Sequence, residues 1–186
     1  MGKTTNEFIS STGAIINVTG VSPLLLQKIQ ASFEKKTPKP VIPTYEAESA
    51  GGDIEVLPHN ETTVSTEEEK EQWEKYKKEK EQWDRELNEK VLRALILKGV
   101  VMDVDDSAEW VQEQEFLGID IPDDKNERKI HYFETEVVGS ASDVFALVTE
   151  IMKLSGLDEE AIADAESLFR SELQRGKDNP QEHLAE

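Results

Sequence analysis

The hydrophobic pattern near the N-terminus predicts a short strand followed by a helix. Residues 14–19 are rich in β-branched side chains and lie between two glycines, as a strand does. Ser22 and Pro23 then supply a helix N-cap and a first helical residue. The apolar residues that continue this helix are Leu24, Leu25, Ile29 and Phe33. We therefore expect a small β-α segment over 1–36, with polar and mobile residues ahead of the strand.

Prolines and glycines replace the periodic pattern between residues 37 and 64. No helix can run through this stretch, because it contains Pro38, Pro40, Pro43, Gly51, Gly52 and Pro58. Residues 53–57 alternate like an edge strand, which could pair with the strand at 14–19. The sequence leaves two interpretations open, and we favour a Pro/Gly-rich linker over an edge strand.

A long charged helix is predicted over residues 65–99. Thr66 and Glu69 have the spacing of a capping box, and no helix breaker follows until Gly99. A helix of about 33 residues is roughly 50 Å long at 1.5 Å per residue. Lys80 interrupts its apolar stripe, and only residues 87–97 are apolar enough for a buried helix end.

One short repeat lies within this helix. Lys-Glu-Gln-Trp ends at Trp73 and returns ten residues later, ending at Trp83. Ten residues make nearly three turns, so the two tryptophans lie on roughly the same helix face. Aromatic anchors dominate many interfaces, which favours Trp73, Tyr76 and Trp83 as a partner-binding surface, with Leu24 and Leu25 as second choice. The alternative, equally supported, is that the tryptophans pack within the chain on the N-terminal segment.

The C-terminal part reads as a bundle of short helices over 100–176. A capping box at 106–109 predicts a helix that carries Trp110 and stops at Gly118. Ile130, Phe133 and Val137 line a helix that ends near Gly139. Further helices are predicted from Ser140 to Gly156 and from Asp158 onward, before a disordered tail over 177–186. The predicted fold class is mainly α, with an N-terminal β-α segment, an extended linker, one long helix and this bundle.

Composition narrows the possible partners. Hydrophobic residues make up 37% and charged residues 33%, the net charge is −19, and there is no cysteine. Disulfides and thiolate chemistry are therefore excluded, and nucleic acid and anionic membranes would be repelled. The first residues open no apolar run, so we expect neither a signal peptide nor a membrane span. The high charge is best explained as a means of keeping a small-cored protein soluble, while basic protein partners stay possible.

No catalytic, metal-binding or cofactor-binding constellation is predicted. His59, His131 and His183 lie far apart in the chain, and no phosphate loop or nucleophile elbow occurs. The acidic stretch from Asp103 resembles a calcium loop but has Ala108 where that loop needs glycine. We therefore expect a binding protein and not an enzyme.

The order of segments resembles a family of small proteins from tailed bacteriophages, the tail assembly chaperone-like proteins. The residues that carry this resemblance are 22–32, Pro43-Thr44-Tyr45, the Trp-bearing helix ending at 97–100, Trp110, 154–157 and 159–162. The resemblance implies a helical protein without cofactors that binds the tape measure protein, tail tube subunits or both during virion assembly in the host cytoplasm. Two alternatives stay open: a structural component of the tail or neck, and an acidic decoy that binds a basic host protein. The near-balanced Lys and Glu of the long helix argue against the decoy.

Overall fold

The computed structural model describes residues 5–48, 51–105 and 107–157. The described chain is mainly helical with two small sheets, and it divides into two compact units, Met1–Ile29 with Lys90–Glu186 and Gln30–Glu89. The helices are α1 (Pro23–Lys36), α2 (Glu67–Gly99), α3 (Ala108–Phe116), α4 (Lys125–Tyr132), the π-helical turn η1 (Phe133–Val137) and α5 (Ala141–Leu154). The strands are β1 (Thr5–Ile9), β2 (Ile15–Thr19), β3 (Thr44–Glu48), β4 (Ile54–Pro58) and β5 (Val100–Val101).

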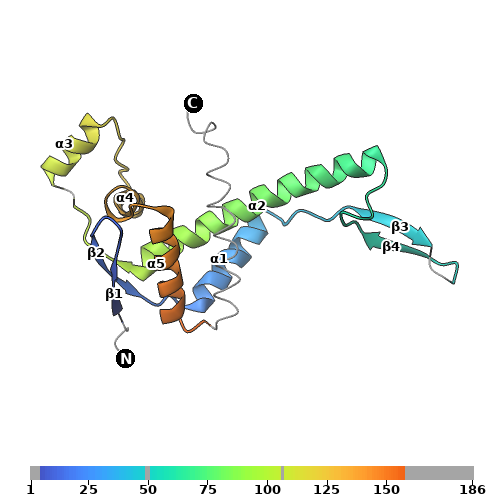
Figure 1. Cartoon of the computed structure of the whole chain (residues 1–186), viewed down its shortest axis with the longest axis horizontal. Helices are drawn as coiled ribbons and strands as arrows, with labels where there is room; N and C mark the ends of the chain where they lie inside the picture. Colours follow the sequence, from blue (N-terminus) through green and yellow to red (C-terminus); the bar gives the residue numbers. More distant parts are fainter. Residues whose placement is uncertain (1–4, 49–50, 106, 158–186) are drawn as a thin grey trace. The chain divides into compact units, whose positions relative to one another are not determined.

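An antiparallel sheet of order β1-β2-β5 lies in the first unit (Figure 1). The strand predicted at 14–19 is confirmed as β2. For residues 5–9 the expectation of mobility is wrong, because they form β1. Phe8 pairs with Ile16 on the face that packs on the core, and Asn6 donates to the Glu150 carboxylate at 2.7 Å. These contacts fix a segment whose own sequence is mostly polar.

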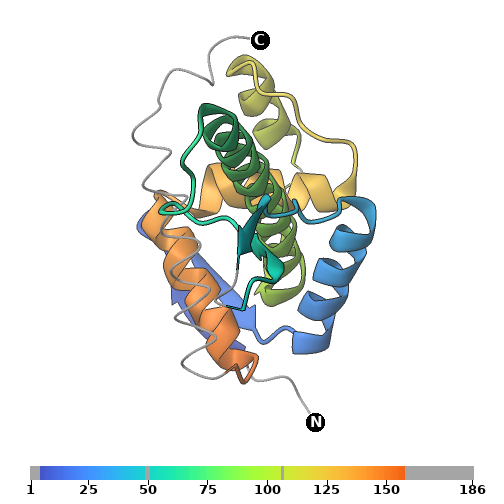
Figure 2. The same ribbon diagram turned by 90° about the vertical axis from the view of Figure 1, so that its right-hand side faces the viewer.

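The core of the first unit lies between this sheet and the helices. α5 lies beside β2 (Figure 2). The end of β2 approaches α5 so closely that a Cβ at Gly20 would lie 2.2 Å from the carbonyl oxygen of Leu154. The largest fully buried side chains are Val18, Leu95, Ile96, Val100, Phe133, Leu147 and Ile151.

Helix α2 begins and ends as the sequence predicts. The Thr66 hydroxyl accepts from the Glu69 amide at 3.2 Å, and the Glu69 carboxylate accepts from the Thr66 amide at 2.8 Å, which is a capping box. At the other end, the Lys129 ammonium donates to the carbonyls of Leu97 and Val100 at 3.3 and 2.6 Å. Burial is wider than expected, because Tyr76 is also buried, well outside residues 87–97.

The stretch between α1 and α2 contains a hairpin and is more than a linker. β3 pairs with β4 in an antiparallel two-stranded sheet (Figure 1). The alternating segment at 53–57 does form a strand, but its predicted pairing with 14–19 is wrong. Both sides of β2 are already occupied, by β1 and β5, and residues 44–48 supply the partner instead.

The short C-terminal helices begin at side-chain caps. Ser107 caps α3 by accepting from the Trp110 amide, so this helix begins one residue later than a cap at position 106 implies. Asp124 caps α4, and Ser140 with Asp143 forms the capping box of α5. The predicted helix from Asp158 and the predicted tail over 177–186 lie outside the described residues.

Candidate interaction surfaces

Trp83 is buried inside the second unit and holds two segments together. Its side chain is 6% exposed, and its ring centroid lies 5.4 Å from that of Phe33 in α1. The indole Nε1 donates to the carbonyl of Thr37 at 2.7 Å, and the Lys39 ammonium lies 5.8 Å from the ring centroid. Trp83 therefore fixes the end of α1 and the start of the segment leading to β3. For this residue the structure agrees with packing inside the chain.

Trp73 and Tyr76 form a separate aromatic pair on α2. Their ring centroids lie 5.3 Å apart, Tyr76 is 8% exposed, and Trp73 is half-buried. The buried Trp73 Nε1 has no hydrogen-bond acceptor in the part of the chain that the structure describes. The three aromatic residues predicted to bind a partner thus present little ring surface, and their role in binding stays a prediction.

The second-choice residues differ from each other in exposure. Leu24 is 66% exposed, whereas Leu25 is half-buried and packs against the core of the first unit. Leu24 alone of these two offers an accessible side chain.

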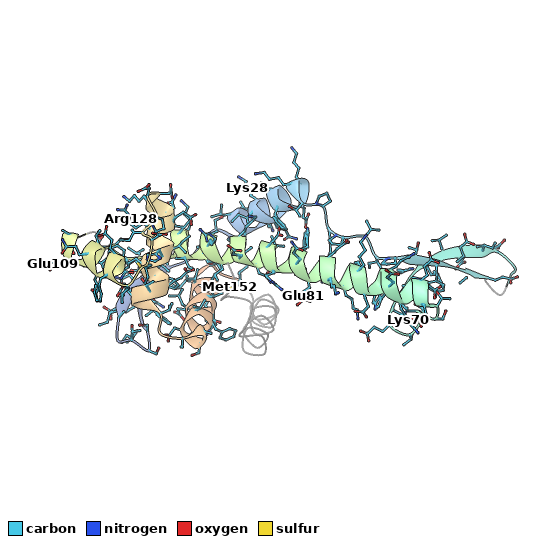
Figure 3. All side chains as sticks on the ribbon, turned by 90° about the horizontal axis from the view of Figure 1, so that it is seen from above. Lys28, Lys70, Glu81, Glu109, Arg128 and Met152 are labelled. Carbon is cyan, nitrogen blue, oxygen red and sulfur yellow. The ribbon has the colours of Figure 1, made fainter. Side chains whose placement is uncertain are left out.

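The charged surface of α2 is largely paired within the helix. Lys70 contacts Glu67 and Lys77 contacts Glu74, each at 2.6 Å, and Lys80 contacts Asp84 at 2.5 Å. Lys70 and Glu81, labelled in Figure 3, mark this stretch of the helix. Exposed pairs of this kind contribute about 0.3–0.5 kcal/mol each to helix stability. They explain how so polar a helix forms, and they point to no partner.

The β3–β4 hairpin has one open face, which the sequence analysis did not identify. Glu46 pairs with Val56 and Glu48 with Ile54, so these four side chains share a face. All four are exposed, Ile54 at 70% and Val56 at 64%. We call these four residues the open hairpin face. Alternation in 44–48 and the Gly51-Gly52 turn were the signals that could have revealed it.

The opposite face of the hairpin is partly covered. Tyr45, Ala47 and Leu57 are half-buried, and the Tyr45 ring lies 4.8 Å from that of His59, which is 5% exposed. The His59 amide donates to the Pro43 carbonyl at 2.8 Å and closes the open end of the hairpin. One face is therefore held within the unit and the other is left to solvent.

The hairpin is acidic as well as apolar. Between residues 40 and 60 the chain contains no Lys or Arg, and its acidic residues are Glu46, Glu48, Asp53 and Glu55. Among the described residues, β3 and β4 form a sheet by themselves, so each strand has an outer edge with unpaired backbone groups. The hairpin combines exposed apolar side chains, free backbone donors and acceptors, and negative charge.

Among the described residues, helix α3 of the first unit is attached through the side that carries Trp110 and Gln114. Trp110 Nε1 and Gln114 Nε2 both donate to the same Glu136 oxygen, at 3.2 and 3.0 Å. The Trp110 ring also lies 5.5 Å from the Tyr132 ring, and burial, followed by the charges of Asp105 and Glu136, raises the pKa of Tyr132. Beyond this attachment, Phe116 is 89% exposed. α3 therefore also carries an exposed apolar side chain, an aromatic one.

The described histidines are used in packing. His59 lies against Tyr45, with its Nδ1 3.3 Å from the Thr63 hydroxyl, and the His131 ring lies 6.3 Å from that of Trp110. Within residues 5–48, 51–105 and 107–157, no cluster of three or more acidic or histidine side chains could hold a metal ion. No described helix combines the length and hydropathy required to cross a membrane.

Comparison with known proteins adds no assignment. No protein-family model matches the chain, and neither curated proteins nor solved structures give a match.

Proposed function

We propose that this chain is a tail assembly chaperone-like protein of a tailed bacteriophage, which binds the tape measure protein, tail tube subunits or both during virion assembly. Two things support the proposal: the order of segments described above and the open hairpin face. The hairpin face carries it, because Ile54 and Val56 are exposed side by side on one strand, and no described element of their unit covers them. Large exposed apolar patches on a protein surface mark interaction sites, and Ile54 and Val56 form a small patch of this kind.

The chemistry of the hairpin fits capture of an incompletely folded protein. The free strand edges offer backbone hydrogen bonds to an extended segment, and Ile54 and Val56 offer apolar contacts to its side chains. Glu46 and Glu48 lie on the same face and keep a complex soluble. Two apolar side chains cover far less than the roughly 1,600 Å² of a standard stable interface, so binding through this face is weak and reversible.

Co-expression with the tape measure protein of the same phage tests the proposal. We expect the wild-type chain to raise the soluble fraction of the tape measure protein and to co-purify with it. The double variant Ile54→Ser/Val56→Ser removes both apolar side chains of the open hairpin face and should abolish both effects. Ile15→Ser is the matched control, because Ile15 is also a strand isoleucine and is 65% exposed.

Two outcomes would contradict different parts of the proposal. If the wild-type chain neither binds nor solubilises the tape measure protein or the tube subunit, the assembly role is wrong. If it binds them but the double variant binds equally well, the role stands and the hairpin is not the surface. Mass spectrometry of purified virions distinguishes a chaperone from a structural component of the tail or neck. A chaperone is absent from the particle or substoichiometric in it, whereas a structural component is present in full amount.

A further inference from the structure

The strongest concentration of net negative charge in the sequence lies around α3. Residues 99–124 contain no Lys or Arg. Nine of the chain's 40 acidic residues fall within 103–124, namely Asp103, Asp105, Asp106, Glu109, Glu113, Glu115, Asp120, Asp123 and Asp124. This contrasts with the upstream half of α2, where lysines and glutamates alternate and pair. The α3 segment is therefore a local source of negative potential.

The attachment of α3 determines which of its faces is open. Trp110 and Gln114 are one turn apart, are 6% and 3% exposed, and both bind Glu136. Glu109, Glu113 and Phe116 follow one another at spacings of four and three residues and so share another face, where all three are exposed. Figure 3 labels Glu109 on this helix. The open face of α3 thus consists of an aromatic ring in line with two carboxylates.

A solvated acidic loop accounts for the carboxylates but not for the aromatic ring. Single exposed apolar side chains are common on protein surfaces, but here two adjacent ones are exposed, Phe116 at 89% and Leu117 at 59%. The hydrogen bonds of Trp110 and Gln114 fix the helix that carries Phe116, which reduces the ordering that binding would otherwise require. An exposed aromatic side chain on a helix that is held in place, with carboxylates beside it, has the form of an interface anchor.

We propose that the open face of α3 docks a basic, apolar helix face of a partner protein, with Phe116 between the partner's apolar side chains and Glu109 and Glu113 opposite its lysines or arginines. Charge complementarity selects this occupant. A second copy of this chain would bring a net charge of −19 against the same acidic segment, and nucleic acid would also be repelled. This docking site is separate from the open hairpin face and does not depend on the tail assembly role.

Two synthetic peptides of equal length and charge serve as probes. The first peptide is a helix with leucines on one face and lysines on the other. The second peptide has serines in place of the leucines. We expect isothermal titration calorimetry to show the leucine peptide binding about tenfold or more tightly than the serine peptide, because only it can bury Phe116. Raising the salt concentration should weaken both peptides, since the carboxylates attract both.

Three variants identify the surface involved. Phe116→Ser should remove the preference for the leucine peptide while leaving circular dichroism unchanged, because the ring is almost fully exposed. Glu109→Gln/Glu113→Gln should weaken both peptides. Ile54→Ser/Val56→Ser, on the hairpin, should leave the preference intact.

The proposal is overturned if the wild-type chain binds neither peptide, if it binds both equally, or if Phe116→Ser retains the preference. If the hairpin variant loses the preference for the leucine peptide, binding belongs to the open hairpin face, and the proposal for α3 is also overturned. Because tape measure binding is measured separately, failure of this inference leaves the proposed assembly role unaffected.

Discussion

The two hairpins of this chain are built alike but are covered differently. β1–β2 and β3–β4 each consist of two five-residue antiparallel strands in which alternate residues share a face. In β2, Ile16 and Val18 are 5% and 0% exposed, because their face of the sheet packs against α5 and the rest of the core. A third strand, β5, pairs with the other edge of β2. The corresponding inward residues of β3–β4, Tyr45 and Leu57, are only half-buried. On the outward faces the two hairpins are alike, because Ile15 is 65% exposed and Ile54 and Val56 are 70% and 64% exposed.

This difference shows that alternation decides which side chains share a face but not whether that face is covered. A two-stranded hairpin is marginally stable by itself, so β3–β4 depends on contacts at its ends. Trp83 holds the segment before it through Thr37, and Ser65 and Thr66 after it are bound by Glu69. A hairpin held at its ends can keep one face open for a partner.

The largest expected contrast comes from the same substitution in both hairpins. Ile16→Ala should destabilise the first unit by about 3 kcal/mol, because it removes buried methylene groups and leaves a cavity. Ile54→Ala should change stability by less than about 0.5 kcal/mol, as exposed substitutions generally do. Urea titration measures the stability of each variant, and hydrogen exchange of the β2 and β4 amides shows which hairpin loses stability. Equal losses in the two variants would mean that the open hairpin face is covered in solution.

Trp83→Phe tests what holds the second hairpin. Phenylalanine keeps an aromatic ring near Phe33 but loses the hydrogen bond from Nε1 to the Thr37 carbonyl. We expect a loss of about 1 kcal/mol, seen as faster hydrogen exchange in β3 and β4. The β1 and β2 amides provide the internal control. If they lose protection to the same extent as β3 and β4, Trp83 stabilises more than its own unit.

Local signals in the sequence were sufficient for both ends of α2 and for the start of α5. The capping box at Thr66 and Glu69 and the absence of a breaker before Gly99 gave α2 both of its ends. Ser140 and Asp143 did the same for the start of α5. β1 could not be predicted in this way, because its residues become a strand only through pairing with β2 and contacts such as Asn6 to Glu150.

The candidate surface was harder to predict than the fold. Spacing placed Trp73 and Trp83 near one helix face, but burial of Trp83 depends on Phe33 and Thr37, which are far away in the sequence. The prolines suggested a linker at 37–64. Pro58 is the last residue of β4, and a strand at the edge of a sheet tolerates proline. Nothing in the spacing alone shows that α3 is held by Glu136.

A smaller effect is expected at Asp143, which ties the turn of the first hairpin to α5. Its carboxylate accepts from the Ser11 hydroxyl and amide and from the Gly139 and Ser140 amides. The Ser11 hydroxyl, followed by the Gly139 and Ser11 amides, lowers the pKa of Asp143. The folded state therefore gains stability above the pKa that aspartate has when unfolded, and loses it as pH falls through the lower folded value. Asp143→Asn should be less stable than wild type at neutral pH.

Thermal unfolding across the acid range measures this difference. The gap between wild type and Asp143→Asn should narrow as the pH falls, because the wild-type carboxylate becomes protonated. Asp123→Asn is the matched control, since Asp123 is exposed. A gap that stays constant down to low pH would show that the asparagine acts through packing and not through charge.

The smallest expected effect is at Glu69. Its carboxylate binds the amides of Ser65 and Thr66, which lie between β4 and α2 in the chain. Hydrogen bonds from the Thr66 and Ser65 amides, and then from the Ser65 hydroxyl, lower the pKa of Glu69 from 4.5 to about 2. The cap therefore stabilises the start of α2 fully above pH 4.5 and is lost as the pH falls toward 2. Carbon-detected NMR titration of the Glu69 carboxyl should give that low value, while the exposed Glu68 serves as a comparison on the same helix turn. Glu69→Gln should increase hydrogen exchange only in the first turn of α2. A normal glutamate pKa at position 69 would mean that the capping box is open in solution and that the hairpin is held from the Trp83 side alone.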